Sequence, residues 1–168
     1  MSVDLIMGLG DDQLNNQFVF LLPTGIPGGG DADAISLRME ETFPIPEEGV
    51  SEYIIEYQGL QIIKTTMKED TDKHFEITVR VDSGWSIYND LKDWKNMVFN
   101  PVTGTALPDS MTRTTAVVQA LDGQKNVVKT FTFKHSKLQK IGISEFDHTG
   151  EEPVKVTLTF IFGYMEED

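Results

Sequence analysis

Apolar and polar residues alternate along much of the chain, and the alternation is most regular near its end. One side of the segment 154–162 carries Val154, Val156, Leu158, Phe160 and Phe162, and the other carries Lys155, Thr157 and Thr159. Successive side chains of a β-strand point to opposite faces, so a period of two indicates a half-buried strand. The polar face holds threonine and lysine and no cluster of reactive groups. The pattern therefore predicts a sheet that forms a surface rather than a catalytic cleft.

The same criterion predicts a mainly β protein. Strands are expected at 18–22, 34–40, 53–57, 60–66, 75–81, 115–121, 127–133 and 154–162. At 168 residues the chain is long enough for one domain with a substantial core. Within that single domain, 1–168, we expect an N-terminal tail at 1–15, a glycine-rich loop at 23–33 and an extended arm and hairpin at 42–66. Pro44 and Pro46 exclude a central strand in the arm, because proline has no N–H for the ladder.

One amphipathic helix is expected between the strands, at about residues 84–98. Its apolar stripe consists of Ile87, Leu91, Trp94 and Val98, which recur at helical spacing. Asp82 or Ser83 is expected to cap the start, and Asn100 followed by Pro101 to end the helix. Trp85 and Trp94 could form a stacking platform for a ligand, but their spacing favours a packing role.

Charge is distributed unevenly along the chain. The net charge is −13, from 27 acids and 14 bases, and residues 1–60 account for −10 because they contain 11 acids and only one base, Arg38. Such a surface argues against tight nucleic-acid binding, which requires lysine and arginine to replace phosphate counterions. Two interpretations stay open: the acids keep the surface soluble, or they form a surface that repels polyanions.

Several classes of protein find no support in the sequence. The chain has no cysteine, which excludes disulfides and thiolate nucleophiles. Residues 1–10 lack the basic start of a signal peptide, and no apolar run reaches the ~20 residues of a membrane span. We expect a protein made in the cytoplasm, with no membrane partner, no cofactor and no resident metal.

Two alternatives rest on small groups of residues. The segment 28–33 and the aromatic residues Tyr53 and Tyr57 suggest a calcium- or carbohydrate-binding β-sandwich module. Glu145, Asp147 and His148 form the densest titratable cluster and would be the site of an enzyme. The two acids would share one strand face, although residues 142–150 fit a turn-bounded polar edge equally well. We rank the enzyme lowest, because acids on one turn do not make a cleft.

The order of the elements is more specific to one family of proteins than any single motif. It begins with an early strand (17–22), a proline-rich acidic connection (42–49) and a strand pair around Ile54 and Ile62. A strand (75–81) then precedes a helix that contains Asp93 and Trp94. The order continues with segments 116–122, 127–133 and 141–147 and closes with a last strand (154–162) before Tyr164 and an acidic end. This order resembles the inner tube proteins of contractile phage tails and related contractile injection systems. The segment 25–33 departs from the family, because it is longer than expected there.

The resemblance implies a fold and a function. It implies a β-sandwich or partial-barrel protomer that assembles into a hexameric ring with a continuous β-barrel lumen, and rings that stack into a tube. The tube would be a negatively charged conduit for DNA, located in the virion tail. Implied partners are further copies of the chain, the tail sheath protein, the tape-measure protein and the baseplate tube initiator, with DNA only in transit. A tube protein of an injection system and the baseplate initiator itself remain alternatives.

Two sets of residues are expected to serve this assembly. The arm that would dock on the next ring consists of Pro44, Pro46, Glu47, Glu48, Glu52, Tyr53, Ile54 and Ile55, because so acidic and proline-rich a segment buries poorly in its own domain. The alternative is that this segment forms a surface hairpin that folds onto the β-sandwich of its own chain. Candidate acids of the lumen are Glu40, Glu41, Glu56, Glu69, Asp70, Asp72 and Glu76.

Overall fold

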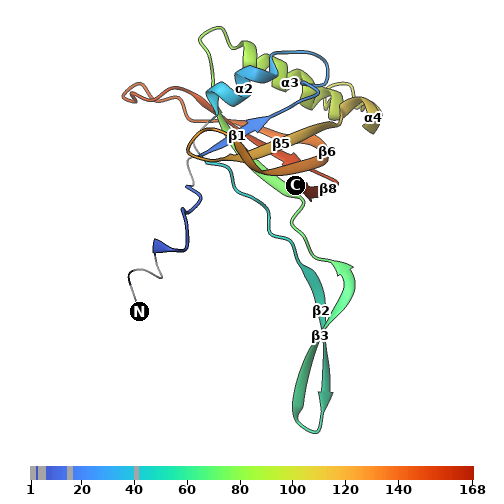
Figure 1. The fold of residues 1–168 in the computed structure, drawn as a ribbon. Coiled ribbons are helices and arrows are strands. Elements are labelled where there is room, and N and C mark those ends of the chain that lie inside the picture. The colour runs from blue at the N-terminus through green and yellow to red at the C-terminus, as the bar shows by residue number, and fades with distance from the viewer. Residues whose placement is uncertain (1–2, 4–6, 15–16, 40–41) are drawn as a thin grey trace.

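The computed structural model describes residues 3, 7–14, 17–39 and 42–168. Figure 1 shows a β body with helices at one end and a long hairpin that projects from the opposite end. The elements are β1 (Phe18–Leu21), α2 (Ala32–Arg38), β2 (Val50–Tyr57), β3 (Leu60–Glu69), β4 (His74–Arg80), α3 (Ser86–Val98), α4 (Asp109–Thr112), β5 (Thr114–Leu121), β6 (Val127–Ile143), β7 (Lys155–Ile161) and β8 (Tyr164–Glu167). The mainly β fold expected from the sequence is confirmed.

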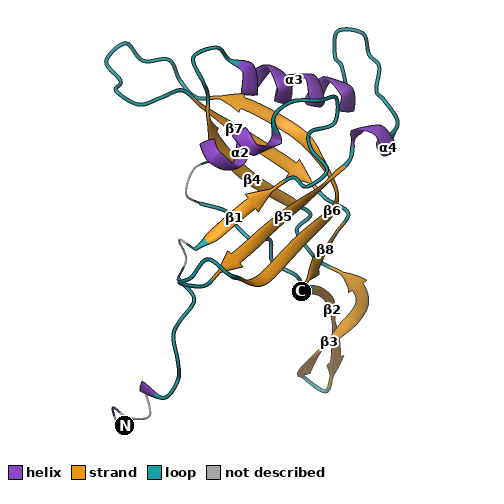
Figure 2. Ribbon diagram, turned by 45° about the horizontal axis from the view of Figure 1, so that its top comes forward, coloured by secondary structure: helices purple, strands orange, loops and turns teal. Residues whose placement is uncertain are grey.

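The long strand β6 organises the body (Figure 2). The strand order is β1-β5-β6-β7-β4, all antiparallel, and β8 also pairs with β6. The first half of β6 lies between β5 and β8, and its second half pairs with β7. The strand bends at His135, whose φ of 57° is left-handed, and the buried Ser136 hydroxyl donates to the Phe133 carbonyl at 2.9 Å. One strand therefore serves two differently oriented parts of the sheet.

An aromatic cluster fills the body between the two parts. Phe75 on β4 stacks on Phe160 of β7, with ring centroids 4.9 Å apart, and lies 4.9 Å from Phe133 of β6. Phe20 of β1 joins them from the far edge of the sheet. All four rings are buried. The alternation that predicts the strands thus places their apolar faces on one common core.

One predicted strand is wrong. Residues 34–40 were expected to be extended, but residues 32–38 form helix α2. A strand would bury Ile35 and Leu37 on the same face, whereas Ile35 is completely buried and Leu37 is 78% exposed. Asp31 caps the helix by accepting a hydrogen bond from the Asp33 N–H at 3.1 Å. A short apolar run in a helix of about two turns gives the same local pattern as a strand.

The region after residue 133 also differs from expectation. Segment 127–133 does not end there, because β6 continues to Ile143. Residues 144–154 form a projecting loop, so Glu145 and Asp147 do not share a strand face. The acidic C-terminal residues form β8, paired with β6 in a register that puts Met165 opposite Phe133. Backbone pairing with β6 decides the structure of this acidic segment, which lacks any strong strand signal of its own.

Helix α3 agrees with its prediction. Ile87, Leu91 and Trp94 form the buried stripe, and Trp94 lies against Phe160. The Asp82 carboxylate accepts hydrogen bonds from the Ser86 hydroxyl at 2.7 Å and from backbone N–H groups of the first turn, which lowers the pKa of Asp82. None of the helices in the described part of the chain is long and apolar enough to cross a bilayer.

We predict that Trp94→Phe destabilises the monomer by about 1–3 kcal/mol, because the buried Trp94 Nε1–H donates to the Thr112 carbonyl at 2.7 Å and its loss leaves that carbonyl unsatisfied. Urea unfolding in dilute solution measures the loss as a lower midpoint at unchanged slope. Trp85→Phe is the control, because Trp85 is only partly buried and rests on Tyr88. Equal losses for the two variants would contradict the role of the hydrogen bond.

Candidate assembly surface

The β2–β3 hairpin stands apart from the body (Figures 1 and 2). Its two strands pair only with each other. Apart from the half-buried Ser51 and Thr66, every residue of β2 and β3 is exposed. An isolated two-stranded hairpin is marginally stable in water. A long one that exposes apolar side chains on both strands is a surface for pairing or packing with another chain.

The register divides the hairpin into two faces. Directly paired residues point to the same side, so the pairs Ile55–Ile62 and Tyr57–Leu60 share one face with Tyr53. We call this the apolar face; its members are Tyr53, Ile55, Tyr57, Leu60 and Ile62, and Lys64 lies at its margin. The opposite face, which we call the acidic face, carries Glu52, Ile54, Glu56, Gln61, Ile63 and Thr65. An unpartnered apolar face on one side and carboxylates on the other favour docking by one face.

A tight turn closes the tip of the hairpin. Gln58 and Gly59 connect the paired residues Tyr57 and Leu60, with φ angles of 47° and 82°. Positive φ at both central residues is the geometry of the two-residue hairpin turn that matches the twist of the strands. The turn therefore fixes the register, and the register fixes which side chains share the apolar face.

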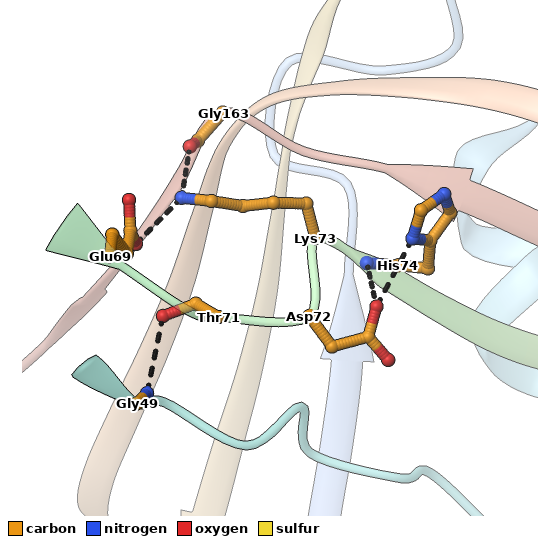
Figure 3. Close-up of polar contacts among 7 residues, drawn as sticks. All are labelled: Gly49, Glu69, Thr71, Asp72, Lys73, His74 and Gly163. Carbon is orange, nitrogen blue, oxygen red and sulfur yellow. Dashed lines mark hydrogen bonds and ion pairs between the residues drawn. The ribbon is translucent and has the colours of Figure 1, made fainter. Parts of the chain in front are cut away.

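Backbone contacts hold the base of the hairpin closed (Figure 3). The Asp70 N–H donates to the Gly49 carbonyl at 2.9 Å, and the Gly49 N–H donates to the Thr71 hydroxyl at 3.4 Å. A Cβ on Gly49 would lie 2.8 Å from the Asp70 carbonyl oxygen, closer than Cβ atoms approach such oxygens. Glycine at position 49 thus permits the strands to meet here.

Lys73 ties this base to the body. Its ammonium donates to the Glu69 carboxylate and to the Gly163 carbonyl, each at 2.8 Å (Figure 3). The Lys73 contact lowers the pKa of Glu69, so the carboxylate stays ionised below its ordinary range. In the same connection between β3 and β4, the Asp72 carboxylate accepts a hydrogen bond from the His74 N–H, and its Oδ1 lies 3.1 Å from His74 Nδ1. Side chains at the end of β3 and in the connection to β4 therefore orient the base.

The arm before the hairpin is anchored in the body. Phe43 is half-buried and stacks on Phe20, with ring centroids 5.5 Å apart. Pro44, Pro46 and Glu47 then border a groove against Asp72, the β4 residues His74, Phe75 and Glu76 and the β7 residue Thr159. Glu48 is exposed. The arm thus leans on its own domain, and the free part of the segment begins with β2.

The proposed lumen acids fall into separate places. Glu69 and Asp72 lie at the base of the hairpin (Figure 3), as does Asp70, whose N–H bonds to the Gly49 carbonyl. Glu76 lies on the exposed side of β4, where its carboxylate accepts from the Thr159 hydroxyl at 3.2 Å. Glu56 lies on the acidic face of the hairpin, bonded to Gln61. Glu40 and Glu41 lie outside the described residues.

The residues of the two alternatives are not brought together. Asp147 accepts from the Thr149 N–H and hydroxyl within its own turn, which lowers the pKa of Asp147. Glu145 and Asp147 border one hollow of the 144–154 loop, without His148 among its lining residues. Within the described parts of the chain, no three acids, histidines or cysteines are grouped as metal ligands. Tyr53 and Tyr57 belong to the apolar face of the hairpin.

Sequence reasoning missed part of this surface. It selected Tyr53, Ile54 and Ile55 without separating their faces, and it left out Tyr57, Leu60 and Ile62. A signal was present: the alternation 53–55–57 is followed by Gln58 and Gly59, and the alternation resumes at 60–62. Read as a hairpin with a two-residue turn, that pattern assigns the apolar face directly.

Comparison with known proteins finds similar structures but no similar sequences. No protein-family model matches the chain, and no curated protein matches it significantly. Solved structures do match. A chain in the extended sheath–tube complex of an extracellular contractile injection system, PVC, aligns over 100% of this chain and 98% of its own length, with a TM-score of 0.64 and 12% identity.

Two further matches come from assemblies of the same kind. A chain in the PVC sheath/tube terminator gives a TM-score of 0.69 at 9% identity, covering 95% of this chain and 99% of its own length. A chain in the baseplate of the anti-feeding prophage, AFP, gives 0.66 at 13% identity, covering 95% and 97%. At such identities the likeness establishes a shared fold, the fold of chains found in contractile injection systems.

We predict that Gly49→Ala loosens the hairpin at its base, because the new Cβ displaces the Asp70 carbonyl. In native-state hydrogen exchange of the monomer, the β2 and β3 amides should exchange at least about tenfold faster, with β5 and β6 unchanged. Gly123→Ala is the matched control, since nothing lies within 4 Å of a Cβ placed there. Unchanged hairpin exchange in Gly49→Ala would show that the close approach is not limiting.

Proposed function

We propose that this chain is a structural protomer that assembles through its hairpin into stacked rings, forming the inner tube of a contractile tail or injection apparatus. The main observation is the β2–β3 hairpin, whose apolar-face residues are all exposed and whose strands, among the described residues, pair only with each other. The fold shared with chains of contractile injection assemblies supports the same conclusion. Stacking of rings gives that face a partner and stabilises a hairpin that alone would be marginal.

Ring closure uses the edges of the sheet. Within the described residues, β1 and β4 end the main strand path, and β8 pairs on one side only. Met39 covers part of the β4 edge by bridging to Val79. Edges left with unpaired N–H and C=O groups are satisfied when neighbouring copies join their sheets, and a closed ring leaves none exposed. We propose six copies per ring, enough strands to surround a channel wider than that of a porin.

We propose that the channel conducts DNA in a phage tail. An acidic wall gives phosphate no counterion-release gain, so the polymer passes without being retained. Among the described candidates, Asp70 and Glu76 are exposed and are not held by a lysine or arginine. The sheath protein, tape-measure protein and baseplate tube initiator are the partners that this role requires. A tube of an injection system is the alternative use of the same assembly.

The assembly role predicts a face-specific effect of mutation. Ile62→Ser removes an exposed residue of the apolar face and should raise the concentration needed for ring or tube formation at least about tenfold, with the monomer fold unchanged. Ile63→Ser is the matched control, since Ile63 is the next residue, more exposed, and lies on the acidic face. Sedimentation and negative-stain microscopy measure both. If both variants assemble like the wild type, the hairpin is not the assembly element.

The conduit role predicts an effect of charge. The double variant Asp70→Lys with Glu76→Lys should fold within about 0.5 kcal/mol of the wild type, because both side chains are exposed. Its tubes should retain a fluorescent oligonucleotide at 0.05 M salt and release it at about 0.2 M, whereas wild-type tubes retain none. Glu145→Lys with Glu151→Lys makes the same charge change on the 144–154 loop. Equal retention by both double variants would argue against a lumenal position for Asp70 and Glu76.

A further inference from the structure

The end of the body opposite the hairpin carries a second exposed apolar surface. The connection between α3 and α4, residues 99–108, exposes Phe99, Val102 and Leu107, with Val102 91% exposed. Figures 1 and 2 both place α3 and α4 at the helical end, away from the hairpin. We call residues 99–108 the receiving loop.

The receiving loop has a fixed shape. The Asn100 N–H donates to the Thr105 carbonyl at 2.8 Å, and the Gly104 N–H donates back to the Asn100 carbonyl at 2.8 Å. The Asn100 side chain accepts from the Val102 N–H at 3.0 Å, and the Leu107 N–H closes the loop onto the Met97 carbonyl at 3.0 Å. Gly104, with φ of 71°, permits the turn. Val102 is therefore held out at the tip of an ordered turn.

Charge distinguishes this loop from its neighbours. Residues 99–108 contain no charged side chain. The 144–154 loop carries four acids, Glu145, Asp147, Glu151 and Glu152, and the 23–31 loop ends at Asp31 beside Asp33. The arm and hairpin are themselves acidic: residues 42–63 contain four acids and no lysine or arginine. An acidic hairpin is repelled by the two acidic loops and not by the receiving loop.

We infer that the receiving loop binds the apolar face of the β2–β3 hairpin of a second copy of this chain. The inference rests on the proposed function, and it adds the receiving surface and the direction of stacking. Two different surfaces at opposite ends of one molecule make a head-to-tail contact that repeats without limit, as a tube requires. Hairpin-to-hairpin contact would instead close a two-fold dimer and end the growth. Burial of Ile55, Tyr57 and Ile62 against Val102 removes apolar area from water on both copies.

Cross-linking tests the contact directly, because the chain has no cysteine of its own. One preparation carries Ile62→Cys and a second, of different tagged mass, carries Val102→Cys. The two are mixed, assembled and treated with a short bis-maleimide. We expect the mixed pair as the main product, at least about tenfold above the product from Ile62→Cys mixed with Phe146→Cys. Phe146 is a matched control, being 72% exposed on the acidic 144–154 loop.

Assembly of point variants provides the second readout. Val102→Ser should raise the assembly concentration about tenfold with unchanged circular dichroism, and Phe146→Ser should leave it unchanged. Tubes that form without the mixed Ile62–Val102 product overturn this inference and leave the proposed function standing. Cross-linking of Ile62→Cys to itself shows hairpin-to-hairpin contact and also overturns it. Absence of any rings or tubes from the unmodified protein removes the proposed function and the inference together.

Discussion

The bend of β6 at His135 is the constraint on which the rest of the body depends. A 17-residue strand cannot follow one flat sheet and still cover both sides of a core, so it changes direction where His135 adopts a left-handed conformation. Before the bend it pairs with β5 and β8, and after it with β7. The bend brings Phe133 toward Phe75 and Phe162, and these rings join the two parts of the sheet.

Different interactions stabilise the hairpin and the body. The body is held by a buried aromatic core, whereas β2 and β3 have only their mutual hydrogen bonds, a tight turn and the base around Gly49 and Lys73. Most of its side chains stay exposed in the monomer. In the proposed assembly the apolar face stays available for another copy, and its position depends on the base that joins the hairpin to the body. The proposed assembly contacts are thereby largely separate from the contacts that stabilise the monomer.

Unequal charge complements this separation. The first 60 residues carry most of the net negative charge, and they include the arm and the first strand of the hairpin. Carboxylates on one hairpin face oppose packing through that face and favour contact through the other. In the proposed contact these carboxylates also disfavour acidic loops as partners, so charge restricts where the apolar face binds. There, buried apolar area supplies the attraction, and repulsion between acids selects the site.

The sequence by itself determined the mainly β class, most of the strands and helix α3, because period-two and helical patterns reflect one buried face and need no knowledge of partners. It also marked the hairpin as a segment that stays exposed, whereas the arm before it leans on the body through Phe43 and Pro46. Tertiary structure decided the rest. Helix α2 replaced a predicted strand because Ile35 alone had a place in the core, and β8 formed because β6 offered a free side.

The candidate surface divides in the same way. The residues Tyr53, Ile54 and Ile55 were found from composition, but their separation onto two faces came from the register set by Gln58 and Gly59. The receiving loop has no pattern of its own, since Phe99, Val102 and Leu107 follow neither period. Its exposure, its fixed turn and its position opposite the hairpin are properties of the folded chain. Local sequence encodes which side chains the hairpin presents. Only packing of the whole body decides which loop lies at the end of the molecule opposite the hairpin.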